Sequence, residues 1–127
     1  MSARVYATLA ERAAVTIRGG HRAIVDAVYA KDTDRQAIEH VAAAASVPFI
    51  GLWLEAPESV LIARTERRRN DPSDADANVI RMQRAQDTGH IGWRGLDASL
   101  PAASVLSGAI DRVRDQLRGA LNAVADG

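Results

Sequence analysis

Arginines gather in the stretch between residues 61 and 76, which reads LIARTERRRNDPSDAD. Arg64 and Arg68 stand four residues apart in a helical pattern, so their side chains share one face of the helix. Guanidinium groups that converge from a helix can bind phosphate oxygens in pairs and stabilise the charge of a phosphoryl group during transfer. The spacing alone favours a simpler interpretation, a solvated charge run that pairs with acidic neighbours such as Glu66 and Asp71.

Asp26 interrupts the apolar run Ala-Ile-Val-Asp-Ala-Val at residues 23–28. A carboxylate in such a run costs free energy unless hydrogen bonds or charges compensate it. If the run is a parallel strand, Asp26 lies near its carboxyl end, where open α/β sheets bind ligands. There it can orient a metal-bound water or accept a proton from a substrate hydroxyl. The alternative, a carboxylate that accepts hydrogen bonds from loop amides, is equally open.

Composition narrows the classes of function. Sixteen basic and sixteen acidic residues give zero net charge, and neither tryptophan lies in a basic stripe, so nucleic-acid binding is not expected. The chain has no cysteine and its three histidines show no ligand spacing, so no metal site is predicted from the residues. No apolar run reaches the length of a membrane span, and the charged first residues do not form a signal peptide. We therefore expect a cytoplasmic protein that does not bind membranes.

The length of 127 residues fits a single domain over residues 1–127. Apolar periodicity, turn residues and capping patterns predict helices and strands in alternation. In chain order we expect a helix over 4–18, a strand over 22–29, a helix over 33–46 that begins with a Thr33–Gln36 capping box, a strand over 48–54, helices over 57–69 and 73–87, a short strand over 96–99 and a helix over 102–125. This alternation is typical of an α/β domain with a parallel sheet.

Several segments together resemble a known family. They are VYATLAERA, AIVDAVY, PFIGLWLEAPESVLIAR, RRNDPSDAD and the W-x-x-L-D-A-S of residues 93–99. In this register the chain is similar to predicted AAA-type P-loop small-molecule kinases related to gluconate kinases, shikimate kinases and zeta toxins. These domains occur alone or fused behind aminoglycoside-phosphotransferase-like domains. The resemblance implies a P-loop NTPase kinase-like fold, a three-layer parallel sheet covered by helices, and ATP and Mg as cofactors.

The resemblance also assigns roles to individual residues. Asp26 matches the family's acidic residue near substrate and metal, and Arg64 and Arg68 match the lid arginines that contact ATP phosphates. The lid-like helical region then covers residues 57–88, and its acidic motif contains Ser73, Asp74 and Asp76.

The chain departs from the family in one respect. The P-loop signature GxxxxGK[ST] does not occur in the 127 residues, and the only lysine, Lys31, has Ala30 before it and Asp32 after it. We therefore expect only the C-terminal part of the family fold, an incomplete P-loop kinase homologue with residual nucleotide or phosphate binding. Whether it is an enzyme stays open, and alone it is expected to transfer no phosphoryl group.

Two other functions are compatible with the same residues. One is a dimeric or heteromeric interaction module, and the other is half of an ATP-dependent kinase that a separate P-loop chain completes. For the sheet, we expect the strands at 23–28 and 49–54 to pair directly in a three-stranded parallel sheet. A homodimer would then cover the apolar surface that remains.

Overall fold

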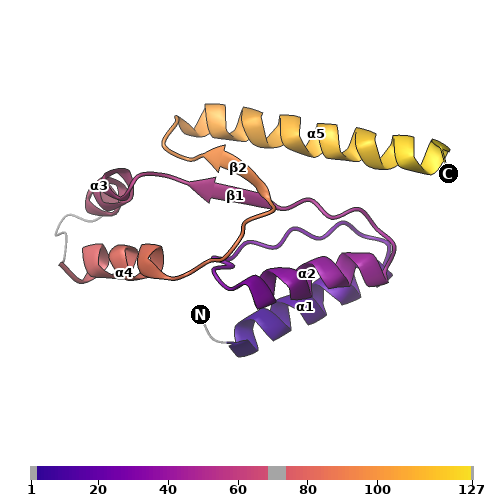
Figure 1. Ribbon diagram of the computed structural model, residues 1–127, viewed down its shortest axis with the longest axis horizontal. Helices are drawn as coiled ribbons and strands as arrows, with labels where there is room; N and C mark the ends of the chain where they lie inside the picture. The colour runs from indigo at the N-terminus through magenta and orange to yellow at the C-terminus, as the bar shows by residue number, and fades with distance from the viewer. Residues whose placement is uncertain (1–2, 69–73, 127) are drawn as a thin grey trace. The chain divides into compact units, whose positions relative to one another are not determined.

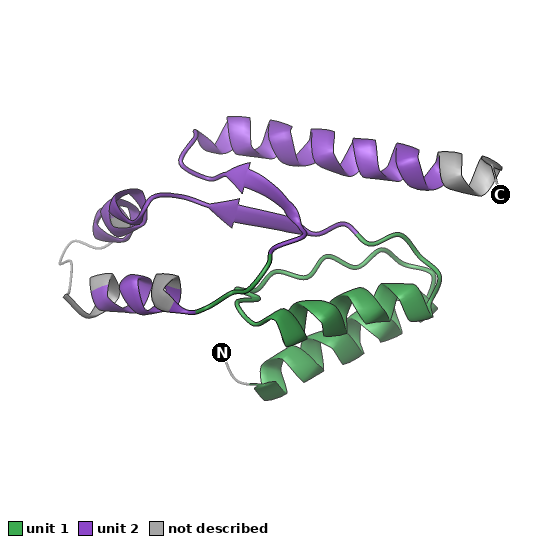
Figure 2. Cartoon of the chain, in the orientation of Figure 1, with its two compact units in different colours: residues 1–49, 87–90 green, residues 50–86, 91–127 purple. Residues whose placement is uncertain are grey.

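The computed structural model describes residues 3–68 and 74–126. For residues 68, 74–77, 84–85 and 122–126 it describes the backbone alone. The chain divides into two compact units (Figure 2). Unit 1 contains Met1–Phe49 and Asp87–His90, and unit 2 contains Ile50–Gln86 and Ile91–Gly127. Each unit is described by itself.

Unit 1 consists of two packed helices, α1 (Ala3–Arg18) and α2 (Asp32–Ala44), and the extended chain that joins them (Figure 1). Its small core contains Ala13, Tyr29, Ile38 and Ala42. These side chains come from both helices and the end of the connection, so burying them fixes the helix pair.

The predicted end of α1 at the two glycines is confirmed. Gly20 adopts a left-handed φ of 83°, which costs glycine little. The Gly20 N–H donates to the Ile17 carbonyl at 2.9 Å, and the His21 N–H donates to the Thr16 carbonyl at 3.2 Å. This pair of hydrogen bonds is a Schellman motif, which satisfies the last carbonyls of the helix.

The predicted start of α2 at Thr33 is wrong by one residue. The helix begins at Asp32, its N-cap is Lys31, and no side chain caps it. Gln36 Nε2 donates to Asp32 Oδ2 at 2.8 Å, so this glutamine partners the aspartate and makes no capping box with Thr33. Asp32 and Asp34 in the first turn suit the positive end of the helix dipole, which explains a stable start without a cap.

The predicted strand over residues 22–29 is also wrong. The segment is extended and its burial alternates, with Tyr29 buried and Ile24 98% exposed, but it forms no ladder among the described residues. An extended segment becomes a strand only when a neighbour pairs with its N–H and C=O groups. The expected three-stranded sheet is therefore not formed, and the described sheet has two strands in the order β1–β2.

Unit 2 contains that sheet, whose strands β1 (Leu52–Glu55) and β2 (Arg94–Asp97) run parallel as predicted. The register pairs Trp53 with Gly95 and Glu55 with Asp97. Helix α5 (Ala102–Asp126) packs against β2 (Figure 1). These elements confirm an α/β protein with a small parallel sheet.

The remaining elements of unit 2 are α3 (Glu58–Arg68) and α4 (Asp74–Ala85), which pack against each other. Both helices were predicted at these positions. Among the described residues, none of the helices has the length and apolar character that a membrane span requires.

Trp93 and Gly51 fit closely beside the sheet. A Cβ atom on Gly51 would lie 2.4 Å from Trp93 Cγ, closer than side chains approach one another. The Trp93 ring meets the Trp53 ring edge to face, with centroids 6.4 Å apart and planes at 69°. The absent side chain at Gly51 thus makes room for the tryptophan pair.

Candidate functional site

Asp26 lies on the exposed side of the extended segment in unit 1. Within the described residues its carboxylate accepts no hydrogen bond and forms no ion pair, so neighbouring loop amides do not hold it. Asp26 also belongs to the lining of a hollow of about 390 Å³ between this segment and α1. Arg12 and Arg22 line the same hollow, so two arginines and one aspartate border it.

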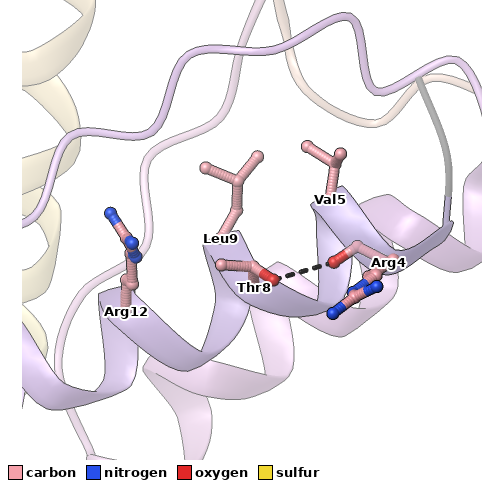
Figure 3. Close-up of a pocket in the computed structure, with 5 residues that line it drawn as sticks. All are labelled: Arg4, Val5, Thr8, Leu9 and Arg12. Atoms are coloured by element: carbon pink, nitrogen blue, oxygen red, sulfur yellow. Dashed lines mark hydrogen bonds between the residues drawn. The ribbon is translucent and has the colours of Figure 1, made fainter.

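A second, shallower hollow of about 270 Å³ follows α1 (Figure 3). Val5 and Leu9 supply its apolar surface, and Arg4 and Arg12 lie at its two ends. The Thr8 hydroxyl donates to the Arg4 carbonyl at 2.9 Å, so its proton serves the helix backbone. This hollow offers apolar surface and little directed hydrogen bonding.

The candidate lid residues belong to α3, to α4 and to the chain between them. Arg64 and Arg68 both lie in α3, four residues apart, so they share a helix face as predicted. Arg64 is half-buried, and the Arg68 side chain is outside the described residues. Asp74 and Asp76 lie in the first turn of α4 with side chains that are likewise not described, and Ser73 falls outside the described residues.

Arg81, another arginine of the lid-like region, lies on α4 and has a structural contact. Its Nε donates to Glu58 Oε1 at 3.0 Å, which joins α4 to the first turn of α3. Both side chains are exposed, so the pair is worth about 0–1 kcal/mol. Arg81 therefore forms an ion pair at the surface of unit 2.

Two carboxylates end the parallel strands in unit 2. Glu55 Oε1 accepts a hydrogen bond from Trp53 Nε1 at 3.0 Å. Asp97 accepts bonds from the Ser99 hydroxyl and from the Ser99 N–H. These two bonds, the hydroxyl first, lower the pKa of Asp97. The Asp-Ala-Ser motif therefore forms a local turn that closes β2.

Arg35 is a site residue that sequence reasoning missed. Its side chain is only 3% exposed, and its guanidinium donates to the carbonyls of Tyr29, Ala30 and Thr88. One signal in the sequence could have found it. Arg35 lies in the first turn of α2, where the helix dipole disfavours a cation, so its position must serve another purpose.

Tyr29 adjoins this arginine and is strongly constrained. Its φ of 50° lies in the left-handed region, which is uncommon for a bulky residue. Burial, the nearby Tyr6 and the nearby Asp34, in that order, raise the pKa of Tyr29. Such strain persists only where the surrounding contacts enforce it, and it often marks functional segments.

ATP with Mg is the cofactor that the resemblance implies, and the residues present do not fit it by themselves. The described residues contain no group of three or more His, Cys, Asp or Glu side chains able to hold a metal ion. The sequence also lacks the glycine-rich loop and lysine that cradle phosphates. No reaction step through this cofactor can be derived from these residues alone.

The helices and the parallel strand pair define an α/β protein. A family model described as an AAA domain matches residues 1–88. The chain belongs to this family, a P-loop NTPase-like kinase family. No curated protein and no solved structure matches the chain.

Proposed function

We propose that these residues form the substrate-side and lid portion of a P-loop small-molecule kinase and that they transfer no phosphoryl group without a P-loop supplied by another segment. One observation carries the proposal. The family match covers residues 1–88, yet GxxxxGK[ST] does not occur in the 127 residues. Phosphoryl transfer depends on positioning and electrostatic stabilisation, and the P-loop amides and lysine supply much of both.

The exposed segment around Asp26 supports this proposal. Ile24 is 98% exposed and Val28 is 47% exposed, and the backbone between them has no ladder partner among the described residues. An added strand would pair with this backbone and cover these side chains, as extended segments do when they join a sheet edge. In the completed fold, Asp26 would accept the proton of the substrate hydroxyl, and Arg64 and Arg68 would contact phosphates.

An activity assay and a binding assay test the proposal together. In a coupled ADP-release assay, the 127-residue chain should give no turnover above buffer with Mg-ATP. Calorimetric titration with Mg-ATP at low salt should show weak binding that fades as salt rises, because surface arginines are screened. Turnover that Asp26→Asn abolishes would contradict the proposal, since it would show a complete active site in these residues.

A second candidate function is a homodimeric interaction module, and exposed apolar side chains on α5 favour it. Leu106 is 61% exposed and Leu121 is 69% exposed. A second copy of the chain is the commonest cover for such a face. Sedimentation velocity at micromolar concentration should then show a dimer that Leu106→Lys dissociates, while Ser107→Lys leaves it intact. A monomer at every concentration would exclude this candidate.

A further inference from the structure

Arg35 combines deep burial with a positive charge. Removing such a charge from water costs several kcal/mol unless strong hydrogen bonds replace the lost hydration. Its Nη1 donates to the Tyr29 carbonyl at 2.8 Å and to the Ala30 carbonyl at 2.9 Å, and its Nη2 donates to the Thr88 carbonyl. Asp32 Oδ1 lies 3.6 Å from Nη2, so the carboxylate partly balances the charge. Three backbone carbonyls of unit 1 therefore accept hydrogen bonds from the guanidinium.

The first two carbonyls belong to the turn that follows the Asp26 segment. Both backbone polar groups of Tyr29 are bonded there, because its N–H donates to the Tyr6 hydroxyl at 3.0 Å while its carbonyl accepts from Arg35. These contacts enforce the left-handed conformation of Tyr29. Arg35 therefore fixes the course of the chain three and four residues after Asp26.

The third carbonyl belongs to the segment that follows α4. Helix α4 ends at Ala85, and the chain enters unit 1 at Asp87. Asp87 Oδ1 accepts a hydrogen bond from the Gly89 N–H at 2.9 Å, and Gly89 adopts a φ of 66°. This small turn presents the Thr88 carbonyl to Arg35. The guanidinium contact therefore holds the C-terminal end of the lid-like region, residues 57–88.

We propose that Arg35 is a positioning residue that fastens residues 87–90, the unit 1 segment in which the lid-like region ends, to the turn after Asp26. The term lid rests on the proposed function, whereas the fastening itself is a property of unit 1. Three directed bonds from one planar group require a guanidinium, because a lysine ammonium lacks the rigid fork that reaches two separate segments.

Hydrogen exchange followed by mass spectrometry tests this inference in the 127-residue chain. Arg35→Ala should speed amide exchange at residues 28–31 and 86–90 about tenfold or more, because each charge-assisted bond contributes appreciably to local stability. Exchange in α5 should not change. Arg35→Lys should not restore the protection, whereas added methylguanidinium should restore it in Arg35→Ala. Arg18→Ala, which removes an exposed arginine at the end of α1, is the control, and methylguanidinium should leave it unchanged.

A double-mutant cycle isolates the Thr88 contact. Gly89→Ala strains the turn without adding a steric contact, because no atom lies within 4 Å of the new Cβ. If Arg35 and the turn act through the same bond, Arg35→Ala and Gly89→Ala should be strongly non-additive in the exchange of residues 86–90. If Arg35→Ala unfolds the chain, Arg35→Lys takes its place in the cycle.

Additive effects, or exchange at 86–90 that Arg35 variants do not alter, would overturn the inference. A parallel titration with inorganic phosphate tests the proposed function separately from the fastening. Missing phosphate affinity with a non-additive exchange cycle would reject the proposed function and keep the fastening. Phosphate affinity together with an additive exchange cycle would keep the proposed function and reject the fastening.

Discussion

The backbone N–H of Tyr29 donates to the hydroxyl of Tyr6 at 3.0 Å, and the two rings meet edge to face with centroids 5.0 Å apart. This pair joins the first helix to the strained turn that Arg35 also holds. Tyr6→Phe keeps the ring contact and removes only the acceptor. We expect it to lower the free energy of unfolding by about 1–3 kcal/mol, because a part-buried N–H loses its partner. Urea denaturation measures this change, and Thr8→Ala, which removes a hydroxyl bonded within α1, should cost less.

The raised pKa of Tyr29 predicts a loss of stability in alkali. Its usual value is 10.0, and burial, Tyr6 and Asp34 raise it in the folded chain. Between the unfolded and folded pKa values the native state binds more protons, so the stability that Tyr29 contributes is full below pH 10 and falls as pH rises further. Urea denaturation between pH 8 and 11 should show this fall. The fall should be smaller in Tyr29→Phe, and equal slopes in both proteins would contradict the assignment.

Gly51→Ala should disturb the tryptophan pair. The new Cβ would lie 2.4 Å from Trp93 Cγ, so the ring must move, and such overpacking costs about 1–3 kcal/mol. Near-ultraviolet circular dichroism should change at the same time, because the Trp53–Trp93 geometry changes. Gly95→Ala is the matched control in the adjacent strand, where a Cβ meets no atom within 4 Å. Equal effects of the two substitutions would show that backbone entropy, not the ring, is responsible.

Helices were the part of the fold that the sequence predicted best. Each described helix lies at its predicted place, because apolar spacing and the Gly19–Gly20 stop are local signals. The predicted strand over residues 22–29 was wrong because strand formation depends on a neighbouring strand that the local sequence cannot reveal. The apolar run there predicted a buried strand, whereas residues 23–28 alternate between half-buried and exposed, and the run carried no information about pairing.

The candidate site was predicted only in part, for a similar reason. The helical spacing of Arg64 and Arg68 is a local property, and α3 confirms it. Arg35 escaped notice because its partners are backbone carbonyls, one of them 53 residues away, which no side-chain pattern records. The roles of Asp26, Arg64 and Arg68 in binding or catalysis stay predictions.

Ser99→Ala should raise the pKa of Asp97 toward its usual value of 3.8, because both the hydroxyl and the ordered turn lower it. Carbon-detected NMR of the carboxyl group measures this directly. A lowered pKa stabilises the fold above the unfolded value, and this stabilisation is lost as pH falls through the folded pKa. The variant should therefore show a weaker dependence of stability on pH in acid. Ser104→Ala, an exposed serine near the start of α5, should leave the Asp97 titration unchanged.

The arginine pair on α3 gives the sharpest test of phosphate binding. Arg64→Ala combined with Arg68→Ala should raise the dissociation constant for Mg-ATP or sulfate about tenfold or more, because charge-assisted bonds to phosphate oxygens are lost. The helix itself should persist, since alanine is the best helix former. Circular dichroism checks this, and calorimetry measures the affinity.

Helix α5 offers the matched control for this double variant. Arg114 and Arg118 are exposed and, like Arg64 and Arg68, lie four residues apart on one helix, so replacing both with alanine removes the same charge at the same spacing. If net charge alone attracts the anion, both double variants should weaken binding equally. If α3 carries the site, the α5 variant should keep most of the affinity. Unchanged affinity after loss of Arg64 and Arg68 would place the anion elsewhere, with the Arg12–Arg22 hollow as the next site to test.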